Sequence, residues 1–496
     1  MRSRNVIREE STGEKTRIGR NLSLTKYLRV FYIAVLGVLV GWQISDPSKR
    51  FIEAMVGLIV IGIVWNFSAI QALWFILLTY PFPFAFSMGN STFVFTLIVF
   101  IIYMVHVSTG RYRFHGDKLL NLPIAVIVIA YIVSFYNQSN EPMILKFAIF
   151  HTISFFVILI LYYMIVNLID SEENLRKTIS VFMVSIALVT FFSFIELLFP
   201  GRVILPNLIY SIHKVSLVMK DVRVMGPFRD YELLAQFYAT NAPIVILMIV
   251  RSRRLLIRFM YVLLLVSMLF MQFATITRGA FISLIVGIAY MAWICRKDLN
   301  IVKFTGIAAA SVATLFIIDL IMSRYTVSGS LFARLLGTTI KSGFIPDTRV
   351  ISWAGAVERW LLHPFIGNGP GWDFSYNIEG RLWPHSSYLY YLNIFGIFGT
   401  AAFVLLLYRL MRASMKEVRQ SLVASPFPRA LMKVLHVSLV IITIDMTKVD
   451  YQRNTIYMCF VWILFALISA SRAVIDRSAA PSRADTGGAG RPGVIS

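Results

Sequence analysis

Long apolar stretches recur along almost the whole chain, and they limit what it can fold into more than any other feature. Each stretch has roughly 16 to 25 residues, enough for a helix to cross about 30 Å of hydrocarbon. With 58% hydrophobic and 15% charged residues, the 496-residue chain carries more apolar surface than one soluble core could cover. The sequence therefore predicts an all-α, polytopic transmembrane helical bundle.

The number of spans is predicted to be twelve to fourteen. The third stretch is separated from the second only by Asn66-Phe-Ser68 and contains Pro81 and Pro83, so twelve spans with a re-entrant or broken segment is the alternative to fourteen. Either even number places both termini on one side of the membrane. The stretches are 28–44, 51–66, 68–86, 92–107, 119–136, 144–169, 178–199, 231–250, 259–276, 280–294, 302–322, 386–408, 430–446 and 455–471.

The net charge of +22 is distributed unevenly over the joints between these stretches. Most of the 47 Lys and Arg residues occur in alternate joints, which the positive-inside rule assigns to the cytoplasm together with both termini. Blocks such as Arg251-Ser-Arg-Arg254 are expected to fix topology against anionic lipid, and no nucleic-acid-binding motif accompanies them. The basic joints are 1–29, 108–118, 170–177, 251–258, 296–303, 409–433 and 472–496.

We expect one transmembrane domain over 27–476, with disordered cytoplasmic tails at 1–26 and 477–496. Two outer loops, 200–230 and 323–385, interrupt the apolar pattern and carry much of the remaining basic charge. Because positive charge on the outer side is unfavourable for insertion, we expect these basic residues to serve another purpose than fixing topology. These loops are therefore predicted to form the functional site.

The longer outer loop contains a predicted amphipathic helix over 347–363. Its apolar residues follow helical spacing, Asp347 can cap its start, and Pro364 ends it. Trp353 and Trp360 lie on the apolar face, which predicts a helix in the outer headgroup layer.

His385 directly precedes the apolar run 386–407, so its imidazole is expected at a membrane surface. Gly396 lies eleven residues on, nearly on the same helical face, where a glycine permits close helix approach. An imidazole suits a general base or a hydrogen-bond donor to an oxyanion. A histidine that only anchors the helix end is the equal alternative.

Arginines are the candidate anion ligands. Arg278 occupies a tight joint, Thr277-Arg-Gly279, where bidentate binding of a phosphate is favoured over snorkelling to lipid phosphate. Ligand binding is also favoured for Arg223, beside a Gly-Pro turn, and Arg349 lies in the first turn of the predicted amphipathic helix. The acidic residues of the outer loops occur singly and the two cysteines lie at or inside spans, so no metal site and no disulfide are predicted.

The chain resembles the O-antigen ligase and polysaccharide polymerase superfamily of bacterial inner-membrane proteins from about Arg223 to Leu407. The resemblance depends on the order, spacing and outer-side placement of four short motifs, because each is weak alone. At the position after the histidine the sequence has Ser386, where relatives often have Asn. The motifs are Arg223-x-x-Gly226-x-Phe228, Thr277-Arg-Gly279, Arg349-x-x-x-Trp353 leading to Pro364-x-x-Gly367-x-Gly369, and His385 followed by Gly396 and Gly399.

This resemblance implies an enzyme that transfers a glycan from undecaprenyl pyrophosphate to an acceptor hydroxyl, such as one of the lipid A core, on the periplasmic face of the inner membrane. It implies neither a metal nor another cofactor. His385 corresponds to the residue that activates or orients the acceptor. Arg278 and Arg223 correspond to the diphosphate-binding arginines, with Arg349 a weaker candidate and Gly279 and Gly396 in supporting positions.

Two other functions stay open at the level of sequence. A polymerase would use the same donor with a second lipid-linked glycan as acceptor. A polysaccharide or lipid transporter would need polar residues deep in the bilayer, and Asp319 and Glu196, inside or near the ends of spans, are compatible with that reading.

Overall fold

A computed structural model describes most of the chain from Ser68 onward. Almost all of the described residues belong to one compact unit, Leu73–Ser496, which contains every residue of the candidate site. Predicted spans 28–44 and 51–66 and most of 302–322 lie outside the described part, as do 200–222 and most of 323–346 of the predicted outer loops. The described residues are 68–83, 85–86, 89–110, 112–199, 223–296, 316–317, 319–320, 323, 347–378 and 383–479.

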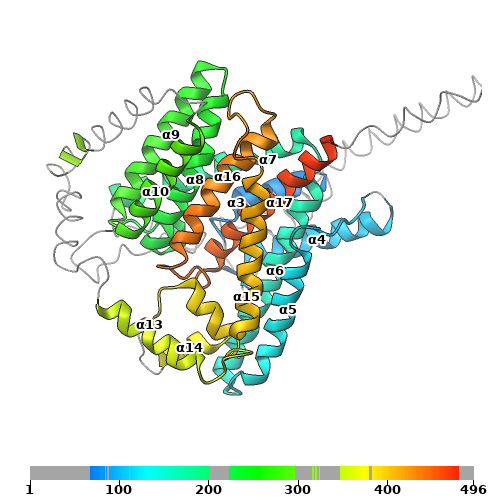
Figure 1. The fold of residues 1–496 in the computed structure, drawn as a ribbon, viewed down its shortest axis with the longest axis vertical. Coiled ribbons are helices and arrows are strands. Elements are labelled where there is room, and N and C mark those ends of the chain that lie inside the picture. The colour runs from blue at the N-terminus through cyan, green and yellow to red at the C-terminus, as the bar shows by residue number, and fades with distance from the viewer. Residues whose placement is uncertain are drawn as a thin grey trace, which may run out of the picture. The chain divides into compact units, whose positions relative to one another are not determined.

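The regular secondary structure of the described part consists of α-helices, single-turn 3-10 helices and one antiparallel pairing of two two-residue strands, β1 (Ala85–Phe86) and β2 (Gly89–Asn90). Figure 1 shows the helices and the connections between them. The helices are α3 (Ala69–Thr79), α4 (Ser91–Ser108), α5 (Asn121–Ser134), α6 (Pro142–Leu168), α7 (Glu172–Leu198), α8 (Tyr231–Arg251), α9 (Leu255–Ala274), α10 (Arg278–Ile294), α13 (Asp347–Trp360), α14 (Trp372–Ile378), α15 (Ser387–Met415), α16 (Phe427–Asp445) and α17 (Thr455–Ala479).

Eight of the described helices are long and apolar enough to cross a membrane, namely α4, α6, α7, α8, α9, α15, α16 and α17. The helices α3, α5 and α10 are apolar but shorter. The predicted helical, multi-pass architecture is thus confirmed in its broad form. The count of twelve to fourteen spans stays a prediction, because several of the predicted spans lie outside the described residues.

The bundle has interior and peripheral helices. The apolar windows of α8 and α17 are 78% and 89% buried, whereas that of α9 is only 22% buried. Leu255, Leu256 and Phe259 of α9 are exposed, as expected for side chains that face lipid tails. The ends of α8 and α17 are therefore held firmly enough to position a site.

α15 is broken at Gly396, which has φ 64° and ψ −164°. Its break packs on the turn that follows α13: a Cβ at Gly396 would lie 2.2 Å from the carbonyl oxygen of Phe365, and Ile397 N donates to Pro364 O at 2.9 Å. Only glycine fits this approach. The close approach predicted at Gly396 is thus made by a turn and not by a second helix, and it ties α15 to the α13–α14 region, seen together in the lower part of Figure 1.

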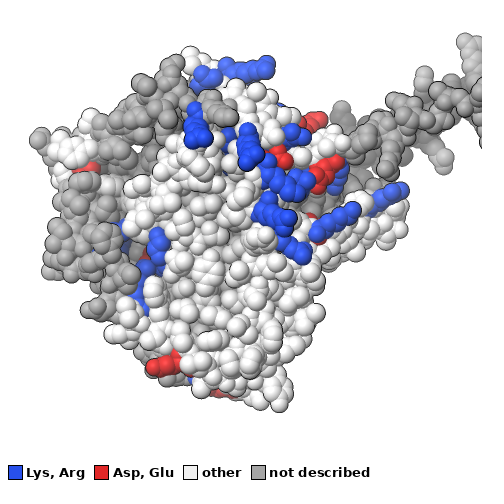
Figure 2. Space-filling model, viewed as in Figure 1, with Lys and Arg blue, Asp and Glu red and all other residues white. Residues whose placement is uncertain are grey.

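Basic side chains gather at one set of helix ends. The last turns of α8, α15 and α17 carry Arg251, Arg412 and Arg477, where positive charge also complements the helix dipole. Figure 2 shows most of the visible Lys and Arg side chains in its upper half, over the region in which Figure 1 labels α7 and α16. The opposite ends of these helices hold the candidate site.

Candidate functional site

The start of α8 is the centre of the site. Asp230 caps the helix, and its carboxylate accepts hydrogen bonds from Glu232 N at 2.8 Å and Leu233 N at 3.1 Å. Asn454 Nδ2 donates to the carbonyl of Phe228 just before the cap. The first turn of α8 is thereby fixed, with Tyr231 and Glu232 in defined positions.

Glu196, near the end of α7, holds the turn that leads into α8. Its carboxylate accepts from Met225 N at 3.1 Å and Gly226 N at 2.7 Å. Beyond this turn, the Arg223 guanidinium carbon lies 4.7 Å from the centre of the Tyr231 ring, a cation–π contact. Glu196 therefore orders the turn that precedes α8, and its engagement weakens the transporter interpretation that it had supported.

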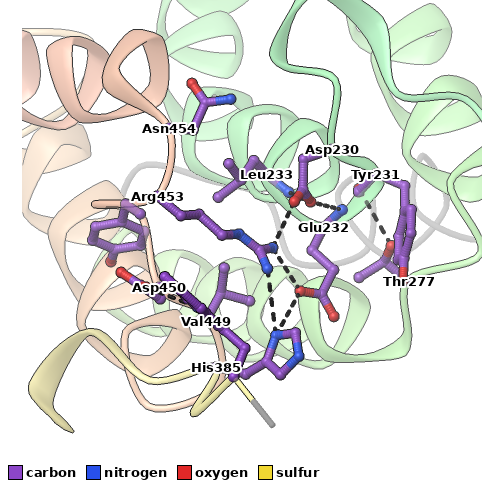
Figure 3. Close-up of polar contacts among 12 residues, drawn as sticks. Asp230, Tyr231, Glu232, Leu233, Thr277, His385, Val449, Asp450, Arg453 and Asn454 are labelled. Carbon is purple, nitrogen blue, oxygen red and sulfur yellow. Dashed lines mark hydrogen bonds and ion pairs between the residues drawn. The ribbon is translucent and has the colours of Figure 1, made fainter. Parts of the chain in front are cut away.

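Glu232 is the point where separate parts of the chain meet (Figure 3). Its side chain is 12% exposed, and Oε1 accepts from Arg349 Nη2 of α13 at 3.3 Å. Oε2 lies 3.0 Å from Arg453 Nη2 and 3.5 Å from His385 Nδ1. A carboxylate that is this buried needs such partners to offset its lost hydration.

Arg453 lies in the connection between α16 and α17 and joins both carboxylates of the α8 start. Its Nη2 is 2.6 Å from Asp230 Oδ2, in addition to the contact with Glu232. Burial alone would lower the pKa of Arg453, but the carboxylates of Asp230, Glu232 and Asp450 raise it above its ordinary value. Burial raises the pKa of Asp230, although Arg453 opposes the shift. The guanidinium is thus a permanent positive charge within the site.

The same connection fixes the segment before α15. Ser387 N donates to Met446 O at 2.9 Å, and Ser387 Oγ donates to Val449 O at 2.8 Å. Two residues before His385, Trp383 Nε1 donates to Asp450 Oδ2 at 3.0 Å. His385 therefore lies between two anchored residues, and its 33%-exposed side chain is directed at the start of α8.

Backbone strain is concentrated around this site. Among the described residues, only three that are not glycine have positive φ: Arg229 at 54°, Ile276 at 55° and His385 at 44°. The left-handed conformation costs roughly 1–2 kcal/mol for such residues, and the cost is greatest for a β-branched side chain such as isoleucine. Strain of this kind occurs preferentially at functional sites, where the surrounding contacts maintain it.

Arg278 follows one of these strained residues. Ile276 leads into Thr277, whose Oγ1 donates to Tyr231 O at 3.3 Å, and Arg278 is the first residue of α10. The carbonyl of Gly279 accepts from Lys448 Nζ at 2.8 Å. The Thr277-Arg-Gly279 joint is therefore attached to the start of α8 on one side and to the α16–α17 connection on the other.

Lys448 adds a further positive group beside this joint. Its Nζ donates to Ser283 Oγ at 2.9 Å and lies 3.6 Å from Asp445 Oδ1. Burial lowers the pKa of Lys448, and the carboxylate of Asp445 opposes that shift. Arg349 lies near enough to contribute a further lowering, so the two cations belong to one electrostatic neighbourhood.

The four residues predicted from sequence thus lie around the first turn of α8. His385 and Arg349 contact the same carboxylate, Arg223 stacks on Tyr231, and Arg278 follows the threonine that bonds to Tyr231. The supporting positions differ: Gly279 contributes a carbonyl near the site, whereas Gly396 lies at the break in α15.

Sequence reasoning missed Glu232 and Arg453. An acidic residue in the first turn of a helix is ordinary, so Glu232 gave no signal of its own. Arg453 had such a signal, because the short segment 447–454 between two apolar stretches also contains Lys448 and Asp450. Several charged residues in so short a segment between two spans could have marked it as part of the site.

The arrangement can accept a proton on an imidazole and bind an anion through guanidinium groups, both at the ends of apolar helices. Within the described residues, no group of three or more His, Cys, Asp or Glu side chains could hold a metal ion, and chemistry without a metal stays a prediction. Comparison with protein-family models and with curated protein sequences gave no match.

Proposed function

We propose that this protein is a membrane transferase that acts on a lipid diphosphate. More specifically, it would be an O-antigen ligase-like glycosyltransferase, which moves a glycan from undecaprenyl pyrophosphate to a sugar hydroxyl of the lipid A core. The observation that carries this proposal is the gathering of His385, Arg349, Arg223 and the Arg278 joint around one helix start, at the ends of apolar helices.

The arginines suit a diphosphate leaving group. When the bond to the glycan breaks, negative charge grows on the phosphate oxygens, and guanidinium groups stabilise such charge through paired N–H donors. Arg223, Arg278 and Arg349 come from three different segments, so they can contact the diphosphate from several sides. The polyprenyl chain would extend along the apolar surface of the bundle, where side chains of helices such as α9 are exposed.

His385 suits the acceptor half of the reaction. Its Nε2 would take the proton of the acceptor hydroxyl while that oxygen bonds to the anomeric carbon, and the bond from that carbon to the diphosphate oxygen breaks. The proton then passes from the imidazole to the departing diphosphate or to water, so that undecaprenyl pyrophosphate is released. Attack opposite the leaving group inverts the anomeric configuration.

The charge distribution supports a periplasmic location in the bacterial inner membrane. The helix ends opposite the site carry Arg251, Arg412 and Arg477, as the positive-inside rule expects of a cytoplasmic side. Near the site, Val350 and Ile351 of α13 are 55% and 62% exposed, which suits a helix resting in the outer headgroup layer. Both termini would then be cytoplasmic.

The test is a reconstituted transfer assay. The purified protein in liposomes is given an undecaprenyl-pyrophosphate-linked glycan with or without a lipid A core acceptor, in the presence of EDTA. We expect a glycosylated lipid A core and free undecaprenyl pyrophosphate only when the acceptor is present. A ladder of longer lipid-linked glycans without the acceptor would identify a polymerase instead. The proposal would be contradicted if no product formed with or without the acceptor, both in EDTA and after Mg²⁺ is restored.

A further inference from the structure

Tyr231 is the first residue of α8, and its ring and its backbone carbonyl make separate contacts. The Arg223 guanidinium carbon lies 4.7 Å from the centre of the ring. The carbonyl accepts a hydrogen bond from Thr277 Oγ1 at 3.3 Å, directly before Arg278 (Figure 3). One residue thus touches two of the segments that carry candidate diphosphate ligands.

The arginines around this helix start are held in two different ways. Arg349 is paired with Glu232 at 3.3 Å, so a carboxylate offsets its positive charge. Arg223 contacts the neutral ring of Tyr231 instead, and in the described part of the chain it makes neither a hydrogen bond nor an ion pair. Its charge is therefore held in place without being neutralised.

This manner of holding an arginine suits the binding of an anion. An aromatic ring attracts a guanidinium through its π face and does not occupy the N–H donors as a carboxylate does. Phosphate oxygens bind those donors in pairs. A carboxylate partner would compete with a phosphate for the same donors, whereas a ring fixes the arginine and leaves them for the ligand.

Both partners of the contact belong to ordered segments. Asp230 caps α8, so the backbone of Tyr231 is fixed. On the other side, Val224 is only 1% exposed, and Glu196 binds the backbone of the turn that follows Arg223. The ring and the guanidinium are therefore brought together by two elements that are each held independently.

We infer that Tyr231 is a positioning residue that holds Arg223, with its charge not neutralised, ready to bind the diphosphate of the lipid donor. It acts through the arginine and not on the reacting atoms. The inference deepens the proposed function and rests on it for the identity of the donor. Binding of a lipid diphosphate can be measured without any transfer, so the two proposals can fail independently.

The first test measures binding of undecaprenyl pyrophosphate to the full-length protein in nanodiscs, by displacement of a fluorescent polyprenyl diphosphate. Tyr231→Leu should raise Kd about 2- to 30-fold, as expected for the loss of one cation–π contact. Tyr231→Phe keeps the ring and should bind like the wild type. Undecaprenol, which lacks phosphate, should bind equally to all three proteins.

A double-mutant cycle shows whether the effect passes through the arginine. In an Arg223→Ala background, Tyr231→Leu should change Kd no further, because the cation that the ring holds is already gone. An unchanged Kd for Tyr231→Leu in the wild-type background, or an equal loss in both backgrounds, would overturn the inference.

The second test uses the transfer reaction. Tyr231→Leu should lower kcat/KM for the lipid donor by a factor similar to the change in Kd and should leave KM for the acceptor unchanged. Tyr231→Phe should transfer at nearly the wild-type rate. An equal rise in KM for donor and acceptor would indicate a general structural effect and would contradict the role.

Phe427→Leu is the matched control, because the Arg176 guanidinium lies 4.5 Å from the centre of the Phe427 ring at the basic end of the bundle, where Arg176 is also paired with Glu172. This variant should leave the Kd of undecaprenyl pyrophosphate unchanged, and a loss as large as that of Tyr231→Leu would contradict the role. If Tyr231→Leu does not fold, Tyr231→Met removes the ring but retains a flexible apolar side chain, and it must weaken binding in the same way.

The two proposals give different outcomes. If binding depends on Tyr231 as expected while the wild type transfers no glycan, the positioning role stands and the proposed function is wrong. If the wild type transfers glycan and Tyr231→Leu binds undecaprenyl pyrophosphate normally, the proposed function stands and the positioning role is wrong.

Discussion

Two buried carboxylates, at the two ends of α15, have similar ion pairs and different surroundings. Glu417 is 9% exposed and lies 3.7 Å from Arg472 and 3.9 Å from Arg429. Glu232 is 12% exposed and also has two arginine partners, but it additionally contacts His385. Strained backbone occurs beside Glu232, and within the described residues no non-glycine residue near Glu417 has positive φ. Ion pairs thus occur at both ends of α15, whereas a histidine that contacts the carboxylate and non-glycine residues with positive φ occur only at the Glu232 end of the described structure.

The largest expected effect is a loss of activity at the Glu232 end. His385→Ala should insert and fold normally but lower glycan transfer in the reconstituted assay by about 10²- to 10⁴-fold, because the acceptor loses its base. His363→Ala, which removes an exposed histidine, is the control and should transfer at the wild-type rate. Normal transfer by His385→Ala would refute the proposed mechanism.

The next effect separates the two ends by stability. Arg453→Ala leaves Asp230 and Glu232 without their shared partner and should cost about 3 kcal/mol, as expected for breaking a buried pair. Arg472→Ala should cost about 1 kcal/mol or less, since its contacts with Glu417 are longer and its other partner, Asp476, is 57% exposed. Thermal unfolding in detergent measures both. Equal shifts would mean that the two clusters do not differ in this respect.

A change that preserves charge tests whether the arginines bind phosphate. Arg278→Lys should lower transfer about 10- to 100-fold, because an ammonium cannot reproduce two parallel N–H donors and loses part of a charged hydrogen bond. Arg258→Lys in α9, among the basic residues of the opposite end, should have no effect on the rate. Full activity of Arg278→Lys would favour simple anchoring to lipid.

The pH dependence of stability tests the buried carboxyl group of Asp450, in the connection between α16 and α17. Burial raises the pKa of Asp450 to about 7, although Arg453 opposes the shift. The folded protein holds the proton of Asp450 more tightly than the unfolded chain does. The contribution of this protonated carboxyl group to the free energy of unfolding is therefore complete below about pH 4 and is lost as the pH rises to about 7. The slope is at most about 1.4 kcal/mol per pH unit. Asp450→Asn should flatten the melting-temperature profile over this range, and an unchanged slope would exclude Asp450 as its source.

The smallest expected effect lies in the exposed pairs of the basic end. Lys177 and Glu173 form an ion pair on the surface of α7 with side chains 53% and 75% exposed. Because water and salt screen such a pair, Lys177→Ala should leave the melting temperature and transfer rate unchanged within error. A clear loss of melting temperature or transfer rate would show that exposed ion pairs at the basic end also contribute to stability or activity.

Local pattern was enough to predict several parts of this protein. The apolar stretches predicted a helical membrane protein, because span length and hydropathy are read directly along the chain. His385 and the arginines were also visible, because each is a costly polar residue beside a span. The outer placement of 200–230 and 323–385, and the activity itself, stay predictions.

Tertiary structure decided which of these residues meet. Glu232 and Arg453 are 221 residues apart in the chain, and only the packing of α8 against the end of the α16–α17 connection brings them to 3.0 Å. Nothing local marks such a contact, since it depends on how whole helices pack and on which side chain of a turn faces inward. The sequence alone therefore determined the membrane class and the candidate residues, whereas the fold decided that a buried carboxylate faces the histidine.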